Sequence, residues 1–154
     1  MKPGDTASDF ALPDQNGTVH TLDSLLADGP IVLFFYPAAM TPGCTKEACH
    51  FRDLASEFAA LGASRVGIST DDVAKQADFA NQQKFDYPLL SDADGAVATA
   101  FGVKRGLLGK FMPVKRTTFV IDTDRRVLEV ISSETNMNAH ADRALETLRK
   151  RSGH

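Results

Sequence analysis

The sequence predicts an α/β domain in which a mixed β-sheet is flanked by helices. The run IVLFFY at 31–36 is apolar, β-branched and aromatic throughout and lies between two prolines, which is typical of a buried strand. Strand-like and helical segments then alternate as far as residue 102, and two strand-like segments and an amphipathic helix complete the chain. Because 154 residues is the size of one domain, we expect a single domain over residues 1–154.

The first part of the chain holds a hairpin, the central strand and a long helix. In DFALPDQNGTVHTL, two short apolar stretches surround Asn16-Gly17, a pair that favours a β-hairpin turn. After strand 31–36, a helical pattern runs from Thr41 to about Leu61. Its apolar positions recur at steps of three and four and form one stripe: Cys44, Ala48, Phe51, Ala55 and Phe58.

The remaining segments repeat this alternation and end in an antiparallel pair. In chain order they are RVGIST (65–70, strand), DDVAKQADFANQQKF (71–85, helix), YPLLSD (87–92, strand), AVATAFG (96–102, helix), RTTFVID (116–122, strand), RVLEVI (126–131, strand) and AHADRALETLRKR (139–151, helix). Asp71 or Asp72 is the expected cap of the first of these helices. The thioredoxin-like fold has this order of elements.

Composition excludes several classes of function. A net charge of −3 gives no general attraction to nucleic acid or to an anionic membrane, so we expect neither as a partner. The apolar run 31–36 is far too short to span a bilayer, and MKPGDTASDF lacks the apolar segment of a secretory signal. Two cysteines provide no disulfide framework for a secreted scaffold. We therefore expect a cytoplasmic protein, in which a cysteine pair is more often catalytic or metal-binding than structural.

Both cysteines lie in PAAMTPGCTKEACH (37–50), directly after strand 31–36. Proline is favoured at the first position of a helix, so Pro42 makes Thr41 the expected N-cap and puts Cys44 in the first turn. Unpaired backbone N–H groups and the positive end of the helix dipole stabilise a thiolate there. The alternative is that Cys44 is a small apolar residue of the buried stripe. The strand–turn–Thr-Pro-Gly-Cys arrangement favours a nucleophile.

Cys49 follows Cys44 by five residues, which on a helix is about 140° around and about 7.5 Å along the axis. A disulfide needs Cα atoms within about 7 Å and converging side chains. The two thiols can therefore bond only after the start of the helix unwinds, which suits a redox switch better than a structural link. Metal binding is the competing interpretation, but two thiols offset by this angle cannot hold one ion, and the adjacent His50 points elsewhere. We expect no metal and no other cofactor.

The sequence also resembles a known family. PAAMTPGC fits the peroxiredoxin pattern P-x-x-x-T-x-x-C, and TPGCTKEACHFRD is similar to the bacterioferritin comigratory protein, or peroxiredoxin Q, subfamily. In that subfamily the second cysteine lies five residues after the first on the same helix. The likeness continues through GDTASDFALPDQNG, SDADGAVATAFGV and RTTFVID, and so covers nearly the whole chain.

The resemblance implies a thiol peroxidase with a role for each matching residue. Cys44 would attack a hydroperoxide and become a sulfenic acid. Cys49 would resolve it to an intramolecular disulfide, which a thioredoxin-type reductant would reopen. Thr41 would orient the peroxide, Pro37 would shield the pocket, and Arg116 would stabilise the thiolate and the developing charge. The substrates implied are hydrogen peroxide and organic hydroperoxides, and the expected state is a monomer or weak homodimer.

Some assignments stay open at this point. Without the motif Arg116 would be a solvated charge at a strand end, and Arg105 is a second candidate for its role. Glu47 either pairs with that arginine and fixes its plane, or is an acid favoured near the helix start by the dipole. A general thiol-disulfide oxidoreductase and a redox-sensing binding module are the alternative functions; the absence of a CxxC pair disfavours the first.

Three features depart from the motif or lie outside it. Ala38-Ala39-Met40 stands where many relatives carry charged residues, which gives the expected pocket an apolar rim. The turn IDTDRRV lacks the glycine often found there. The segment 103–114, VKRGLLGKFMPV, combines basic residues with Leu107, Leu108, Phe111 and Met112. It is either an ordinary surface loop whose apolar residues cover the core, or a docking face for the reductant or a second subunit.

Overall fold

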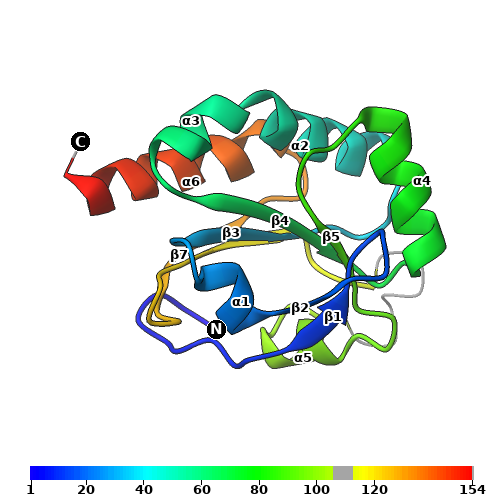
Figure 1. Ribbon diagram of the computed structural model, residues 1–154, viewed down its shortest axis with the longest axis horizontal. Helices are drawn as coiled ribbons and strands as arrows, with labels where there is room; N and C mark the ends of the chain where they lie inside the picture. The colour runs from blue at the N-terminus through cyan, green and yellow to red at the C-terminus, as the bar shows by residue number, and fades with distance from the viewer. Residues whose placement is uncertain (106–112, 154) are drawn as a thin grey trace.

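The computed structural model describes residues 1–105 and 113–153, in which a central sheet carries helices on both faces (Figure 1). In chain order the elements are β1 (Ala11–Pro13), β2 (Val19–Thr21), α1 (Leu22–Leu26), β3 (Ile31–Phe35), α2 (Pro42–Asp53), α3 (Ala55–Ala60), β4 (Ser64–Ser69), α4 (Val73–Gln83), β5 (Leu89–Ser91), α5 (Ala96–Ala100), β6 (Thr117–Ile121), β7 (Val127–Ser132) and α6 (Met137–Ser152).

The central sheet has the strand order β5-β4-β3-β6-β7. β3 pairs in parallel with β4 and antiparallel with β6, so the sheet is mixed, as predicted. All five residues of β3 are buried because this strand lies in the middle of the sheet and both faces are covered. Each strand predicted after the hairpin is present within two residues of its expected ends.

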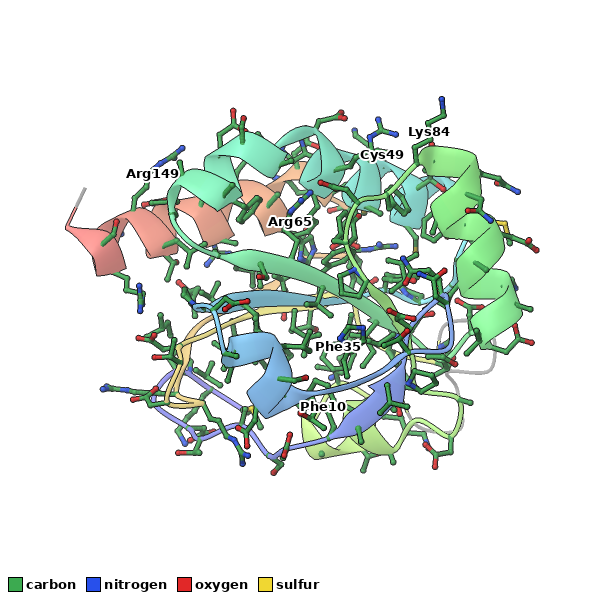
Figure 2. All side chains as sticks on the ribbon, in the orientation of Figure 1. Phe10, Phe35, Cys49, Arg65, Lys84 and Arg149 are labelled. Atoms are coloured by element: carbon green, nitrogen blue, oxygen red, sulfur yellow. The ribbon has the colours of Figure 1, made fainter. Side chains whose placement is uncertain are left out.

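Alternation along β3 divides the interior into two apolar clusters. Val32 and Phe34 pack against α2, α3, α4 and α6 on one face. Leu33 and Phe35 pack on the other face against α1 and α5, together with Phe10 of the N-terminal segment (Figure 2). Cys44 belongs to the first cluster, so the start of α2 is held against the sheet by the main apolar core.

The predicted N-terminal hairpin is confirmed. β1 and β2 are antiparallel, and Gly17 in the turn has φ +80°, a left-handed conformation that glycine adopts without strain. The short helix α1 directly after β2 was not predicted. Its five residues are too few for a periodic pattern, but Thr21 and Ser24 form a capping box that fixes its start.

The predicted continuous helix over 41–61 is wrong in one respect: it is divided at Leu54 into α2 and α3. The cause is an arginine from β4. The Nη1 of Arg65 donates to the carbonyl oxygen of Phe51 at 2.9 Å, and the guanidinium is held in place by two bonds to Asp86 at 2.9 and 3.0 Å. A side chain inserted into the ladder of helix hydrogen bonds is a recognised cause of such kinks.

α6 begins two residues before the predicted start, because the side chain of Asn136 accepts a hydrogen bond from the backbone N–H of Ala139. In the β6–β7 turn, Arg125 takes the left-handed conformation (φ 69°) where a glycine would be unstrained. Its guanidinium donates two hydrogen bonds to Asp23, at 2.7 and 2.8 Å, which helps to hold that turn. Over the residues that the structure describes, no helix is long and apolar enough to cross a membrane.

Candidate active site

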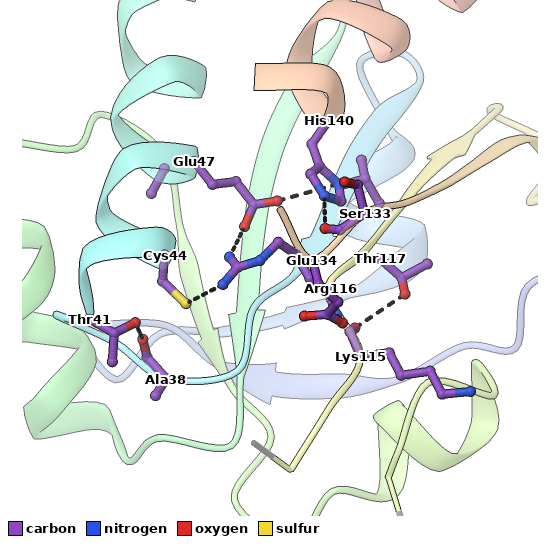
Figure 3. Close-up of polar contacts among 12 residues, drawn as sticks. Ala38, Thr41, Cys44, Glu47, Lys115, Arg116, Thr117, Ser133, Glu134 and His140 are labelled. Carbon is purple, nitrogen blue, oxygen red and sulfur yellow. Dashed lines mark hydrogen bonds and ion pairs between the residues drawn. The ribbon is translucent and has the colours of Figure 1, made fainter. Parts of the chain in front are cut away.

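The connection between β3 and α2 delivers Cys44 to the first turn of the helix, as predicted. Pro42 is the first helical residue and Thr41 is the N-cap. The Thr41 side chain does not cap the helix, however; its hydroxyl donates to the carbonyl oxygen of Ala38 at 2.8 Å (Figure 3). Cys44 itself is buried, with 1% of its surface exposed, while Thr41 is exposed.

This arrangement leaves backbone donors at the cysteine. The first helical hydrogen bond runs from the N–H of Thr45 to the carbonyl oxygen of Thr41 at 2.9 Å. Among the described residues, the N–H groups of Gly43 and Cys44 have no acceptor. These amides and the positive end of the helix dipole favour negative charge at the Cys44 sulfur.

Asp71, which follows β4, also fixes the connection between β3 and α2. The backbone N–H of Ala39 donates to Oδ2 of Asp71 at 2.7 Å, and the hydroxyl of Ser69 donates to the same oxygen at 2.7 Å. Of the two aspartates expected to cap α4, Asp72 is the cap, and Asp71 serves this loop instead. Pro37 is buried directly before Ala38. The backbone that carries Cys44 is therefore anchored to the sheet.

The structure brings Arg116 to Cys44 from the start of β6. Its Nη2 lies 3.4 Å from the Cys44 sulfur, and its Nη1 donates to Oε1 of Glu47 at 2.8 Å (Figure 3). A side chain at Gly43 would come within 3.2 Å of Nη2, so the glycine before the cysteine leaves room for this guanidinium. Arg105, the second candidate, instead pairs with Glu134 at 2.9 Å.

Glu47 lies in the interior rather than on a solvated first turn. Its side chain is fully buried, and the pairing with Arg116 expected from one of the two interpretations is present. Burial raises the pKa of Glu47 to about 8, although the charge and hydrogen bond of Arg116 act in the opposite direction. Burial therefore favours the protonated form of this acid, and Arg116 favours its ionised form.

Two polar residues of the site were missed by sequence reasoning. His140 of α6 is fully buried, and its Nδ1 lies 3.4 Å from Oε2 of Glu47. Glu134, before α6, accepts the backbone N–H of Arg116 at 2.9 Å. A histidine on the apolar face of an amphipathic helix is a signal that could have identified the first, but nothing in the local sequence indicates the second.

Cys49 points to another part of the fold. Its thiol donates to Oε1 of Gln83 at 3.4 Å, near the end of α4, and Arg52 donates to the Gln83 carbonyl oxygen at 2.7 Å. In Figure 2 the labelled Cys49 lies on α2 toward Lys84, which follows α4. Burial raises the pKa of the Cys49 thiol, although the charge of Arg52 acts in the opposite direction. Both cysteines are free thiols on one intact helix, facing different neighbours.

The arrangement can stabilise the thiolate of Cys44, and it keeps Cys49 as a second free thiol that faces α4. Among the described residues, no group of three or more histidine, cysteine and acidic side chains is placed to hold a metal ion. The residues Leu107, Leu108, Phe111 and Met112, expected to belong either to an ordinary surface loop or to a docking face, lie outside the residues that the structure describes.

Comparison with known proteins gives consistent results. A sequence model described as the AhpC/TSA family matches residues 3–130. Peroxiredoxin Bcp of Escherichia coli K12 is 38% identical over 143 residues, which is 91% of each chain. The crystal structure of peroxidoxin BcpB from Mycobacterium tuberculosis is 76% identical, covers 97% of each chain and superposes with a TM-score of 0.94.

A more distant structure is informative as well. The bacterioferritin comigratory protein of Xanthomonas campestris, described with regard to its alkyl peroxide reduction activity, is 32% identical, with a TM-score of 0.83. The alignment covers 93% of this chain and 92% of that one. These similarities confirm the predicted thioredoxin-like fold and extend over nearly all of the sequence.

Proposed function

We propose a residue-by-residue mechanism for this protein, which belongs to the AhpC/TSA family of peroxiredoxins and is a thiol-dependent peroxidase. One observation carries the proposal: the guanidinium of Arg116 lies 3.4 Å from the sulfur of Cys44, at a helix start with free backbone N–H groups. Positive charge and donors converge on one sulfur, which is the requirement for a nucleophilic thiolate.

In the first step the Cys44 thiolate attacks the terminal oxygen of a hydroperoxide. The S–O bond forms as the O–O bond breaks, and the departing oxygen takes up a proton and leaves as water or an alcohol. Cys44 is then a sulfenic acid. Arg116 stabilises the thiolate before the reaction and the negative charge on the oxygens during it, while Glu47 fixes the plane of the guanidinium.

Thr41 orients the peroxide by accepting its hydrogen. The Thr41 hydroxyl already donates its own hydrogen to the Ala38 carbonyl, so its oxygen has lone pairs to offer. The buried Pro37 excludes water behind the reacting sulfur. Ala38, Ala39 and Met40 give this pocket an apolar rim, which suits organic hydroperoxides as well as hydrogen peroxide. The alkyl peroxide reduction described for the relative from Xanthomonas campestris supports that range.

Cys49 resolves the sulfenic acid after the start of α2 unwinds. Its thiol faces Gln83 in the folded helix, so the two sulfurs can meet only when the first turns open. The Cys49 sulfur then attacks the Cys44 sulfur, water leaves, and an intramolecular disulfide forms.

A thioredoxin-type dithiol reopens the disulfide by exchange, becomes oxidised itself and restores both thiols. The two free cysteines suit a protein that works in the reducing cytoplasm, with the disulfide present only during turnover. We propose that one chain holds the catalytic machinery, since Arg116 reaches Cys44 within the chain, and that the protein acts as a monomer or weak homodimer.

Steady-state peroxide consumption, driven by thioredoxin, its reductase and NADPH, tests these roles. Cys44→Ser should abolish consumption, whereas Cys49→Ser should lose thioredoxin-driven turnover and keep one round of peroxide reduction per chain. Consumption by Cys44→Ser at the wild-type rate would show that another group is the nucleophile. Full thioredoxin-driven turnover in Cys49→Ser would show that Cys49 is not the resolving thiol, and would leave the role of Cys44 unaffected.

A further inference from the structure

A chain of buried polar side chains leads from Cys44 into the interior between α2, β6 and α6. Arg116 bridges Cys44 and Glu47, and the second carboxylate oxygen of Glu47, Oε2, lies 3.4 Å from Nδ1 of His140 (Figure 3). The side chains of Glu47 and His140 are both 0% exposed. Bulk water therefore has no direct access to the proton-binding atoms of Glu47 and His140.

The partners of His140 define which ring nitrogen carries hydrogen. Its Nε2 lies 2.9 Å from the carbonyl oxygen of Ser133, which can only accept, so Nε2 must carry a hydrogen. Its Nδ1 lies 2.7 Å from the hydroxyl of Thr118. In the neutral ring, Nδ1 consequently has no hydrogen, and its lone pair accepts the hydrogen of the Thr118 hydroxyl.

Glu47 presents an acceptor to that lone pair. Oε1 of Glu47 is bonded to Arg116, but Oε2 has no hydrogen-bond partner among the described residues. An ionised Glu47 beside a neutral His140 would place two acceptors face to face inside the protein, with a buried carboxylate oxygen left without a donor. One additional proton removes this conflict, whether it sits on Oε2 or on Nδ1.

We propose that Glu47 and His140 share one proton in the reduced enzyme, and that this proton keeps the cluster of Arg116, Glu47 and His140 at a net charge of +1 beside Cys44. In either position the proton leaves the pair neutral. The guanidinium charge is then balanced by the Cys44 thiolate rather than by Glu47. His140 is a positioning residue, since it acts on the sulfur only through Glu47 and Arg116. This role rests on the proposed function of Cys44 as the nucleophile.

The electrostatic surroundings favour the proton on Glu47. Burial raises the pKa of Glu47, against the charge and hydrogen bond of Arg116, and burial lowers the pKa of His140, against its hydrogen bond to the Ser133 carbonyl. The other charged or titratable groups that face the pair from neighbouring elements are Glu134 before α6, Arg143 on α6 and Tyr87 before β5. Glu134 opposes loss of the proton, and Arg143 opposes a charged ring.

The consequence for catalysis is a loss of rate at alkaline pH. When the shared proton dissociates, the net charge of the cluster falls from +1 to 0 and the thiolate loses its counter-charge. We expect the rate constant of wild-type Cys44 with hydrogen peroxide to fall on the order of tenfold through this ionisation. Glu47→Gln should remove the fall, because an amide does not ionise and its oxygen can still accept from Arg116.

His140→Gln gives the complementary result. The glutamine can still donate to the Ser133 carbonyl and removes the Nδ1 lone pair that is fixed opposite Oε2. Ionised Glu47 is then less disfavoured, so the fall should begin at lower pH. A purely structural role would change the rate equally at every pH. His20→Gln is the matched control, because His20 also pairs with a carboxylate, Asp14 at 2.8 Å, but lies on the N-terminal hairpin. It should leave the pH profile unchanged.

Spectroscopy on the reduced enzyme tests the proton without turnover, and so separates this inference from the proposed function. We expect a protonated-carboxyl infrared band at neutral pH that disappears in Glu47→Gln, or else a His140 ring with hydrogen on both nitrogens by ¹⁵N NMR. Absence of both the band and the Nδ1 hydrogen would overturn the proposal, whatever the activity. A pH profile unaffected by Glu47→Gln and His140→Gln would overturn the catalytic role.

Discussion

Replacement of Arg116 by methionine should slow the first chemical step without unfolding the protein. The substitution removes the donor 3.4 Å from the Cys44 sulfur and the partner 2.8 Å from Glu47. A hydrogen bond to a charged group is worth about 1.5–3 kcal/mol, and each 1.36 kcal/mol is a factor of ten in rate. We therefore expect the rate of peroxide reduction to fall between about tenfold and about 150-fold.

The carboxyl left behind does not have to remain an unpaired charge. Because burial raises the pKa of Glu47 to about 8, it can stay protonated at neutral pH once Arg116 is gone. The variant should therefore keep its far-ultraviolet circular dichroism and a cooperative unfolding transition. The rate is measured in a Cys49→Ser background, in which Cys44 is the one remaining cysteine of the chain, by mixing with excess peroxide and trapping unreacted thiol.

Arg105→Met is the matched control, since it removes an arginine of the same neighbourhood whose pair with Glu134 is partly exposed. Such a pair is worth below about 1 kcal/mol, so the rate should change by no more than a small factor. A folded Arg116→Met variant that reacts at the parent rate, or an equal loss in Arg105→Met, would refute the assignment of Arg116.

Three further predictions concern the second half of the cycle and the buried acid. Cys49→Ser treated with one equivalent of peroxide should accumulate a sulfenic acid at Cys44, trapped by dimedone and seen by intact mass; no adduct would contradict the order of the steps. Tyr87→Phe removes a buried hydrogen bond to the Ala48 carbonyl (2.7 Å), worth about 1 kcal/mol, so disulfide formation should be several-fold faster in stopped-flow quench experiments; an unchanged rate would mean that α2 does not open there. The pKa of Glu47 in the folded state is about 8, above its unfolded value, so the folded state retains a proton that the unfolded chain releases. The free energy of unfolding should therefore fall as pH rises from about 4.5 to 8, by at most about 1.4 kcal/mol per pH unit. Urea denaturation of Glu47→Gln should show a shallower fall, and an identical slope would contradict the raised pKa.

The sheet was predictable because its strands carry strong local signals. The apolar run that became β3 and the Asn16-Gly17 turn identify themselves by composition. The kink at Leu54 was not predictable, since it depends on Arg65 reaching the Phe51 carbonyl from a strand that lies later in the chain. Contacts between residues distant in sequence leave no trace in the local pattern.

The candidate site shows the same division. The positions of Thr41 and Cys44 follow from the Thr-Pro-Gly-Cys start of the helix, while the approach of Arg116 was expected from the family pattern rather than from spacing. His140 and Glu134 could not be placed, because their roles depend on how α6 packs against β6 and α2. For the same reason Glu47 could be read in two ways until its burial was known.

The central claim is that Cys44 takes the oxygen and Cys49 resolves it within one chain. Intact mass spectrometry after one equivalent of hydrogen peroxide tests it most directly. Wild type should lose two hydrogen atoms, with peptide mapping that places the disulfide between Cys44 and Cys49; Cys49→Ser should gain one oxygen atom, and Cys44→Ser should stay unchanged. Oxygen gained by Cys44→Ser, or a wild-type disulfide that joins two chains, would contradict the account.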